Sequence, residues 1–115
     1  MTVTIYGIKT CDTVRKARNW LEASGVDHHF VDYRVEGLDS KKLAGWEKAV
    51  GWEKLLNKTS ATFKGLAEAD KEGIDRKKAL ALMQAHPTLI KRPVLDVDGS
   101  ITVGFKPEIY EQAVG

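Results

Sequence analysis

Cysteine is almost absent from the sequence, since Cys11 is the only one among 115 residues. A single thiol cannot form a disulfide within the chain, and a leftover thiol is unusual in a secreted protein of this size. The apolar runs are short and interrupted by charge, so none approaches the roughly 20 residues that cross a bilayer. The start, MTVTIYG, lacks the basic and apolar parts of a signal peptide. We therefore expect a cytoplasmic protein that has no membrane-spanning segment.

An excess of charge of one sign is also missing. The chain holds 18 Lys and Arg against 16 Asp and Glu, and the two signs are interleaved along it, for a net charge of +2. Nucleic acid selects clustered positive charge, so this composition gives no support for a nucleic-acid partner. Hydrophobic residues make up 43% and charged residues 30%, which is typical of an ordinary globular protein. At this length we expect one domain and a monomer.

The first third of the chain carries the pattern of a strand, a helix and a second strand. Alternating β-branched and aromatic residues predict a strand over 2–6 and another over 26–33. Between them, Asp12 or Thr13 can cap a helix that runs to about Ser24. Strands this close together, with one helix between them, indicate a right-handed parallel crossover unit.

The middle of the chain reads as a series of short helices. Capping residues precede apolar residues at helical spacing at Asp39-Ser40, Thr59-Ser60 and Asp75, and we expect no strand over 37–88.

Two antiparallel strands and a helix are expected at the end of the chain. The pair Asp98-Gly99 lies between two apolar runs and is a strong hairpin signal, and Pro107 suits the first turn of a helix. The whole order predicts an α/β protein with a thioredoxin-like fold, in which a mixed four-stranded sheet has helices on both faces. We expect a single domain over 1–115 with an all-helical insertion over about 38–88.

Cys11 lies between the first strand and the first helix, where open α/β sheets place their ligands and chemistry. The unpaired N–H groups and the dipole of a helix N-terminus favour thiolate, and can move a thiol pKa from about 8.5 to roughly 3.5–7.5. Lys9, Arg15 and Lys16 add positive charge nearby, whereas Asp12 opposes them. The balance predicts a thiol pKa below its ordinary value.

An inert, buried cysteine is the alternative, because free cysteines often fill cores. The flanks Lys9-Thr10 and Asp12-Thr13 are polar, and an exposed thiol without a use would be an oxidation liability. We therefore interpret Cys11 as a nucleophile.

A second candidate element is Arg92-Pro93, just before the hairpin. A cis bond there would bend the backbone beside the first loop and present it to a peptide-like ligand, whereas a trans Pro93 would only begin an edge strand. The planar fork of Arg92 suits a carboxylate or an oxyanion, although most arginines are solvated on the surface. No metal site is expected, since His28 and His29 would face opposite sides of a strand and no further ligands are spaced near them.

Four stretches of the sequence, YGIKTCDTVRKARNWL, LLNKTSATFK, LIKRPVL and VGFKPEIYEQ, resemble the arsenate reductase-related ArsC family nearly end to end. The resemblance is to its YffB branch, a relative of the Spx regulators. It implies a thioredoxin-like fold with a helical insertion, with Cys11 as the nucleophile and Pro93 as a cis-proline after Arg92.

The chain departs from the family's arsenate reductases at several positions. The resemblance implies that those enzymes have a histidine at the position of Gly7. It also implies that they have further arginines, at positions where this chain has Asn57 or Lys58 in the middle segment and Lys106 before Pro107. A lysine gives a point charge in place of a bidentate fork, which counts against tight recognition of arsenate. Spx-like proteins carry Cys-x-x-Cys at this turn, but Val14 fills the second position here, so a disulfide switch within the chain is excluded.

An external thiol must therefore clear any adduct on Cys11. The resemblance to the YffB branch implies a glutathione-dependent thiol reductase that acts on a small-molecule or protein disulfide, with glutathione as co-substrate, no tightly bound cofactor, and glutaredoxin as a further partner. The carboxylates and extended backbone of glutathione would suit a set of cations beside a proline turn. The candidate binding residues are Lys9, Thr10, Asp12, Thr13, Arg15, Asn57, Lys58, Arg92, Pro93 and Lys106.

Two other functions stay open at this point. One is a redox-sensing regulator that resembles Spx and binds RNA polymerase, and the other is a divergent arsenate reductase.

Overall fold

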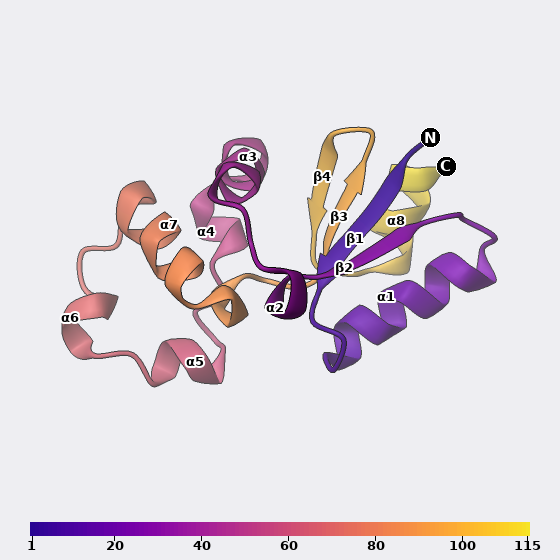
Figure 1. The fold of residues 1–115 in the computed structure, drawn as a ribbon. Coiled ribbons are helices and arrows are strands. Elements are labelled where there is room, and N and C mark those ends of the chain that lie inside the picture. Colours follow the sequence, from indigo (N-terminus) through magenta and orange to yellow (C-terminus); the bar gives the residue numbers. More distant parts are fainter. The chain divides into compact units, whose positions relative to one another are not determined.

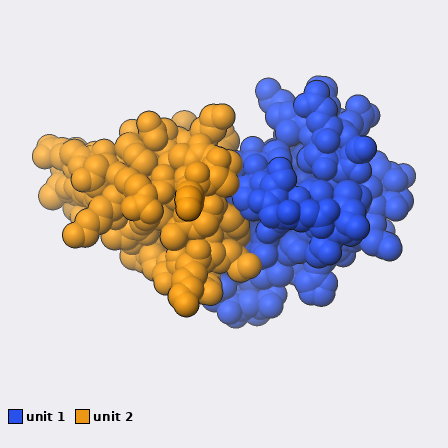
Figure 2. All heavy atoms as spheres, turned by 90° about the horizontal axis from the view of Figure 1, so that it is seen from above, with its two compact units in different colours: residues 1–37, 92–115 blue, residues 38–91 orange.

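The computed structural model describes residues 1–115. The chain divides into two compact units, which Figure 2 shows in different colours. Unit 1 consists of residues 1–37 and 92–115, and unit 2 of residues 38–91. The expectation of one domain with a helical insertion stays a prediction. None of the helices combines the length and the apolar composition that crossing a bilayer requires.

Unit 1 is built on a mixed four-stranded sheet of order β2-β1-β3-β4 (Figure 1). Its strands are β1 (Val3–Gly7), β2 (His29–Asp32), β3 (Val94–Val97) and β4 (Ser100–Val103). Strand β1 pairs in parallel with β2 and antiparallel with β3, and β3 forms the predicted hairpin with β4. At the turn Asp98 and Gly99 have φ of 51° and 91°, the left-handed backbone that this dipeptide tolerates. The predicted α/β, thioredoxin-like fold class is confirmed.

Two helices, α1 (Asp12–Ala23) and α8 (Pro107–Val114), pack against one face of this sheet. Trp20 of α1 meets Tyr110 of α8 edge to face, with 5.8 Å between ring centroids. Both helices are drawn to this face because alternate residues of β1 and β3 point their apolar side chains toward it. The fully or nearly buried residues of this core are Val3, Ile5, Ala17, Leu21, Leu95, Val97 and Tyr110.

The second strand is shorter than its sequence predicted. A strand was expected over 26–33, but β2 ends at Asp32 and a short helix, α2 (Tyr33–Glu36), begins at once. The Asp32 side chain ends the strand because it caps this helix, accepting a hydrogen bond from the Arg34 N–H at 2.9 Å.

Unit 2 is helical. Its elements are α3 (Ser40–Val50), α4 (Trp52–Leu55), α5 (Ala61–Lys64), α6 (Glu68–Lys71), α7 (Arg76–Ala85) and the 3-10 helix η1 (Pro87–Leu89). Asp39, Ser60 and Asp75 cap α3, α5 and α7, as the sequence predicted. Pairing between strand-like segments is limited to an isolated bridge of Leu56 with Ile90.

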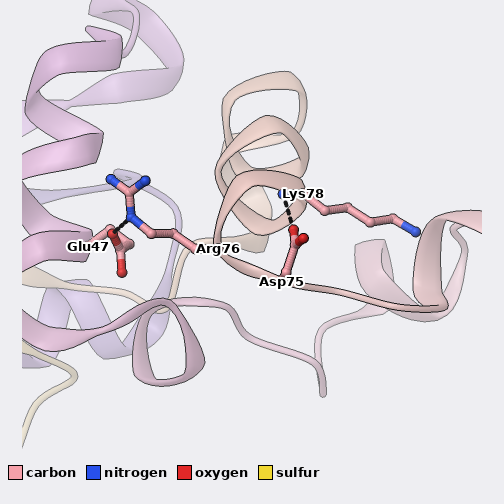
Figure 3. A network of polar contacts seen from close by, with 4 residues as sticks. All are labelled: Glu47, Asp75, Arg76 and Lys78. Carbon is pink, nitrogen blue, oxygen red and sulfur yellow. Dashed lines mark hydrogen bonds and ion pairs between the residues drawn. The ribbon is translucent and has the colours of Figure 1, made fainter.

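An ion pair between a buried carboxylate and an exposed arginine joins two helices of unit 2. Figure 3 shows the side chain of Arg76, the first residue of α7, directed at Glu47 of α3. Glu47 is the one buried charged residue, at 7% exposure. Beside it, Asp75 accepts the Lys78 N–H at 2.8 Å and so caps α7. Because removing a carboxylate from water is costly unless it is paired, Arg76 fixes the start of α7 on α3.

Candidate active site around Cys11

A tight turn carries Cys11 from the end of β1 into α1. The Cys11 N–H donates to the Ile8 carbonyl at 3.0 Å, and the Cys11 carbonyl accepts the Arg15 N–H at 3.0 Å. Cys11 therefore is itself the N-cap of α1, with extended φ and ψ of −78° and 126°. The prediction that Asp12 or Thr13 would cap this helix is wrong. The Asp12 carboxylate is taken by an ion pair with Arg15 one turn along the helix.

Cys11 occupies the N-cap position, where other helices place a residue with a capping oxygen, and it is partly buried. Burial raises the pKa of the thiol, but the backbone N–H groups of Val14 and Thr13 and the guanidinium of Arg92 outweigh it and hold the pKa below its ordinary value. These N–H groups belong to the first turn of α1, where the helix offers them no partner. The predicted direction of the shift is confirmed, and its leading favourable causes are backbone N–H groups and Arg92.

Arg92 acts on a buried group, Tyr33, besides the partly buried thiol. The Arg92–Pro93 bond is cis, and Tyr33 at the start of α2 is only 2% exposed. Burial raises the pKa of Tyr33, and the guanidinium of Arg92 only partly opposes that rise, while charge on Cys11 and Asp32 adds to it. Tyr33 is thus a neutral phenol that shares Arg92 with Cys11. The sequence does not reveal Tyr33 as a site residue, because no local pattern connects residue 33 with residue 11.

Asp32 is another site residue that the sequence did not reveal. Its Oδ2 accepts the Lys9 N–H at 2.9 Å and its Oδ1 accepts the Arg34 N–H at 2.9 Å. Burial alone would raise the pKa of this carboxyl. The N–H groups of Lys9, Arg34 and Val35 have the larger combined effect, so the pKa lies below its ordinary value. The cap on α2 could have been recognised as an Asp at a strand end, whereas the bond to Lys9 depends on tertiary structure.

Of the predicted binding residues in the Cys11 loop, one contacts the sulfur and the others have exposed side chains. Thr13 meets the sulfur through its backbone N–H. Lys9 and Thr10 have exposed side chains, and Asp12 and Arg15 are exposed and bound to each other.

The later predicted residues lie in both units. Pro93 is buried and its carbonyl accepts the Gly104 N–H at 2.9 Å, and Lys106 is an exposed N-cap of α8. Asn57 and Lys58 belong to unit 2. The Asn57 Oδ1 closes a turn by accepting the Thr59 N–H at 3.1 Å, and the Lys58 Nζ lies 5.7 Å from the Trp52 ring centroid. Their roles in binding stay predictions.

Gly7, at the end of β1, lies against α1 too closely for any side chain. A Cβ at this position would be 2.6 Å from Cγ2 of Val14, which is fully buried. The contact gives a physical reason for glycine at the position where the family resemblance implies a histidine in arsenate reductases. The structure contains no group of three His, Cys, Asp or Glu side chains that could hold a metal ion.

Comparison with known proteins shows the family of the chain. The model of the ArsC family matches residues 6–113. An uncharacterized protein of Haemophilus influenzae is 44% identical over 111 residues, which are 96% of this chain and 97% of that protein. The global transcriptional regulator Spx of Listeria innocua is 27% identical and is matched over 92% of this chain and 82% of its own length.

Solved structures give the same result. The structure of the YffB protein superimposes with a TM-score of 0.95 at 46% identity, covering 99% of this chain and 100% of its own. An arsenate reductase (ArsC) related protein from Brucella melitensis has a TM-score of 0.80 at 52% identity, covering 97% of this chain and 93% of its own.

Proposed function

The chain belongs to the ArsC family, in its YffB branch, and on this basis we propose that it is a thiol reductase with one nucleophilic cysteine and glutathione as the external thiol. Cys11 is the nucleophile, and a disulfide in a small molecule or a protein is the substrate.

The observation that carries the proposal is the position of Cys11 at the N-terminus of α1 beside Arg92. Thiolate, not thiol, attacks disulfides, so a lowered pKa raises the reactive fraction near neutral pH. A thiolate with a lowered pKa is also a good leaving group when a second thiol attacks the adduct. The same N–H groups and guanidinium therefore assist both halves of the cycle.

The reaction consists of two exchanges. In the first, the Cys11 thiolate attacks one sulfur of the substrate disulfide, the substrate S–S bond breaks, and the released thiolate takes a proton from solvent. In the second, a glutathione thiolate attacks the mixed disulfide, which returns Cys11 as thiolate and leaves the other sulfur joined to glutathione. Since the chain holds no second cysteine, this step needs an external thiol. Glutaredoxin can fill the same role.

Cations of unit 1 support an anionic co-substrate. Arg92 contacts the thiol, and the side chains of Lys9 and Lys106 are exposed and available to carboxylates. Glutathione carries two carboxylates on an extended backbone, which suits such groups. Lys58 and Asn57 of unit 2 are further candidates in the proposal.

Turnover of a generic disulfide with glutathione tests the proposal. We expect the wild-type protein to reduce hydroxyethyl disulfide at the expense of glutathione and Cys11→Ser to lose that activity, since serine keeps the shape but not the thiolate. Circular dichroism serves as the control for folding of the variant. Full turnover by Cys11→Ser would show that Cys11 is not the nucleophile and would refute the proposal.

A transcriptional regulator is the second candidate, favoured by the 27% identity to Spx of Listeria innocua along 92% of this chain. In that function Cys11 would sense oxidants through glutathionylation and the protein would bind RNA polymerase. Affinity capture from extract of the source cells distinguishes the two. Polymerase subunits in stoichiometric amounts would favour the regulator, and their absence would favour the reductase.

Arsenate reduction is a third candidate, favoured by the 52% identity to the arsenate reductase-related protein of Brucella melitensis. Of the arginines in unit 1, Arg92 is the one that acts on the thiol, while Arg15 is held by Asp12 and Arg18 lies 4.1 Å from the Phe30 ring centroid. We expect no consumption of arsenate in an assay coupled to glutathione and glutaredoxin. Arsenate-dependent oxidation of glutathione would favour an arsenate reductase over a disulfide reductase.

A further inference from the structure

Strand pairing places Asp32 beside the loop that carries Cys11. In the parallel pair of β1 and β2, Gly7 is the register partner of Asp32. Both strands run in the same direction, so the segment that leaves β1 after Gly7 passes the side chain at the end of β2. The Lys9 N–H donates to Asp32 Oδ2 at 2.9 Å as a result.

The peptide group that Asp32 holds is the one on which the Cys11 turn closes. The N–H of Lys9 and the carbonyl of Ile8 are the two ends of a single planar peptide unit. Asp32 accepts from the N–H end at 2.9 Å, and the carbonyl end accepts the Cys11 N–H at 3.0 Å. Fixing this unit therefore fixes the backbone of Cys11, because the peptide cannot rotate at one end without rotating at the other.

The other carboxylate oxygen of Asp32 holds the start of helix α2, which carries Tyr33. Asp32 Oδ1 accepts the Arg34 N–H at 2.9 Å and so caps α2. The first residue of that helix is Tyr33, which is 2% exposed and shares Arg92 with Cys11. One side chain thus joins the backbone of the Cys11 loop to the helix that carries Tyr33.

We propose that Asp32 is a positioning residue for Cys11, which sets the Cys11 turn through Lys9 and the place of Tyr33 through the cap of α2. Asp32 does not touch the reacting sulfur atoms. The effect on turnover rests on the proposed reductase function, whereas the effect on the thiol does not.

Charge and position act on Cys11 with opposite signs, which makes the proposal testable. A carboxylate that acted only through its negative charge would raise the pKa of the nearby thiol, and neutralising it would lower that pKa. A carboxylate that aligns the turn keeps the sulfur on the N–H groups of Val14 and Thr13, and losing it would raise the pKa.

The decisive variant is Asp32→Asn, which has the same shape but only one acceptor oxygen. Its amide NH2 must face either the Lys9 N–H or the Arg34 N–H, so one of the two bonds is lost. We expect the Cys11 pKa, measured from the pH dependence of iodoacetamide alkylation, to rise and the alkylation rate at neutral pH to fall several-fold. A lowered or unchanged Cys11 pKa would overturn the proposal.

Asp39→Asn is the matched control. Asp39 caps α3 in unit 2 in the same way, accepting the Lys41 N–H at 3.0 Å, and has no bond to the Cys11 loop. We expect it to lower stability as Asp32→Asn does while leaving the alkylation profile unchanged. An equal change of the profile in both variants would reduce Asp32 to a cap of α2.

Asp32→Ser covers the case in which Asp32→Asn folds poorly. Serine is a good N-cap for α2, but its single oxygen is too short to hold Lys9 as well. We expect near wild-type stability with a raised Cys11 pKa.

If the Cys11 pKa rises in the Asp32 variants but the wild-type protein reduces no disulfide, the reductase function fails and the positioning role stands. If the wild-type protein is active and neither kcat nor the Cys11 pKa changes, the positioning role fails alone.

Discussion

At the scale of single residues, the thiol and the arginine that acts on it come from the two ends of the sequence. The place of Cys11 at the start of a helix and the direction of its pKa shift were predictable, because a lone thiol with polar flanks follows the first predicted strand. Arg92 followed from the proline beside it and from the family resemblance. Asp32 and Tyr33 were not predictable, because their contacts depend on the parallel pairing of β1 with β2 and on the burial of α2.

The contribution of Arg92 to thiol ionisation is the first prediction at this scale. Its guanidinium lowers the Cys11 pKa through a hydrogen bond and through its charge, so Arg92→Gln should raise that pKa. Arg92→Lys should give a smaller rise, because the charge remains while the fork is lost. The pH dependence of alkylation measures both.

Arg18→Gln is the control for net charge, since Arg18 lies over Phe30, outside the groups that act on Cys11. Equal shifts in the Arg92 and Arg18 variants would show that Arg92 acts only as one charge among many.

The lowered thiol pKa also predicts how stability depends on pH. Below the native pKa of Cys11 the thiol is protonated in both states and contributes nothing. As pH rises through the native pKa, the folded protein loses its proton first, so the unfolded state holds more protons and folding gains stability. The gain is complete once the pH exceeds the ordinary pKa of a free thiol.

Denaturant unfolding of the wild-type protein and of Cys11→Ser, with reductant present, measures this effect. The wild-type protein should gain stability relative to the variant as pH increases across that window. A constant difference at all pH values would mean that the thiol pKa is the same in the folded and unfolded states.

At the scale of elements, the helices and turns that depend on neighbouring residues in the sequence were predictable from local patterns. The helices capped by Asp39, Ser60 and Asp75 and the hairpin at Asp98-Gly99 follow from caps and turn residues. Helix α1 was expected at the right place, although Cys11 and not Asp12 or Thr13 is its N-cap. Helix α2 was missed because its four residues are too few for a helical period and continue the apolar alternation of β2. The common face of α1 and α8 was not predictable either, because only packing of Trp20 on Tyr110 reveals it.

The contact of β1 with α1 predicts the effect of enlarging Gly7. A Cβ would meet the buried Cγ2 of Val14 at 2.6 Å, and a β-branched side chain cannot swing away. Gly7→Ala should therefore lower the free energy of unfolding by about 1–3 kcal/mol, which urea denaturation measures. In the background of Val14→Ala the same change should cost much less. Additive costs in the double variant would show that the two residues do not collide.

The ion pair of α3 with α7 gives the second prediction for elements. Arg76→Ala would leave the buried carboxylate of Glu47 without its partner, and urea denaturation should show a loss of about 1 kcal/mol. The loss stays modest because the Arg76 side chain is 60% exposed and screened by water. Lys77→Ala on the same helix is the control, since Lys77 is exposed, and should change little. Equal losses would assign the effect to helix propensity.

At the scale of the whole molecule, the sequence contains one thiol and two compact units, and the groups that ionise the thiol all belong to unit 1. Unit 2 brings no second thiol. The residues predicted there for binding, Asn57 and Lys58, therefore cannot take part in thiol exchange themselves. In the proposed redox cycle, Cys11 carries out the first exchange and a thiol from outside the chain carries out the second.

This division predicts the products of oxidation. With oxidised glutathione, the wild-type protein should take up one glutathione per chain on Cys11, seen by intact mass, and an excess of reduced glutathione should remove it. Uptake should follow the thiolate fraction, so it should be slower in Arg92→Gln, where the thiol pKa is raised. Cys11→Ser should take up none. An adduct that persists in excess glutathione would mean that Cys11 is shielded from the external thiol, and a cycle completed from outside would then be wrong.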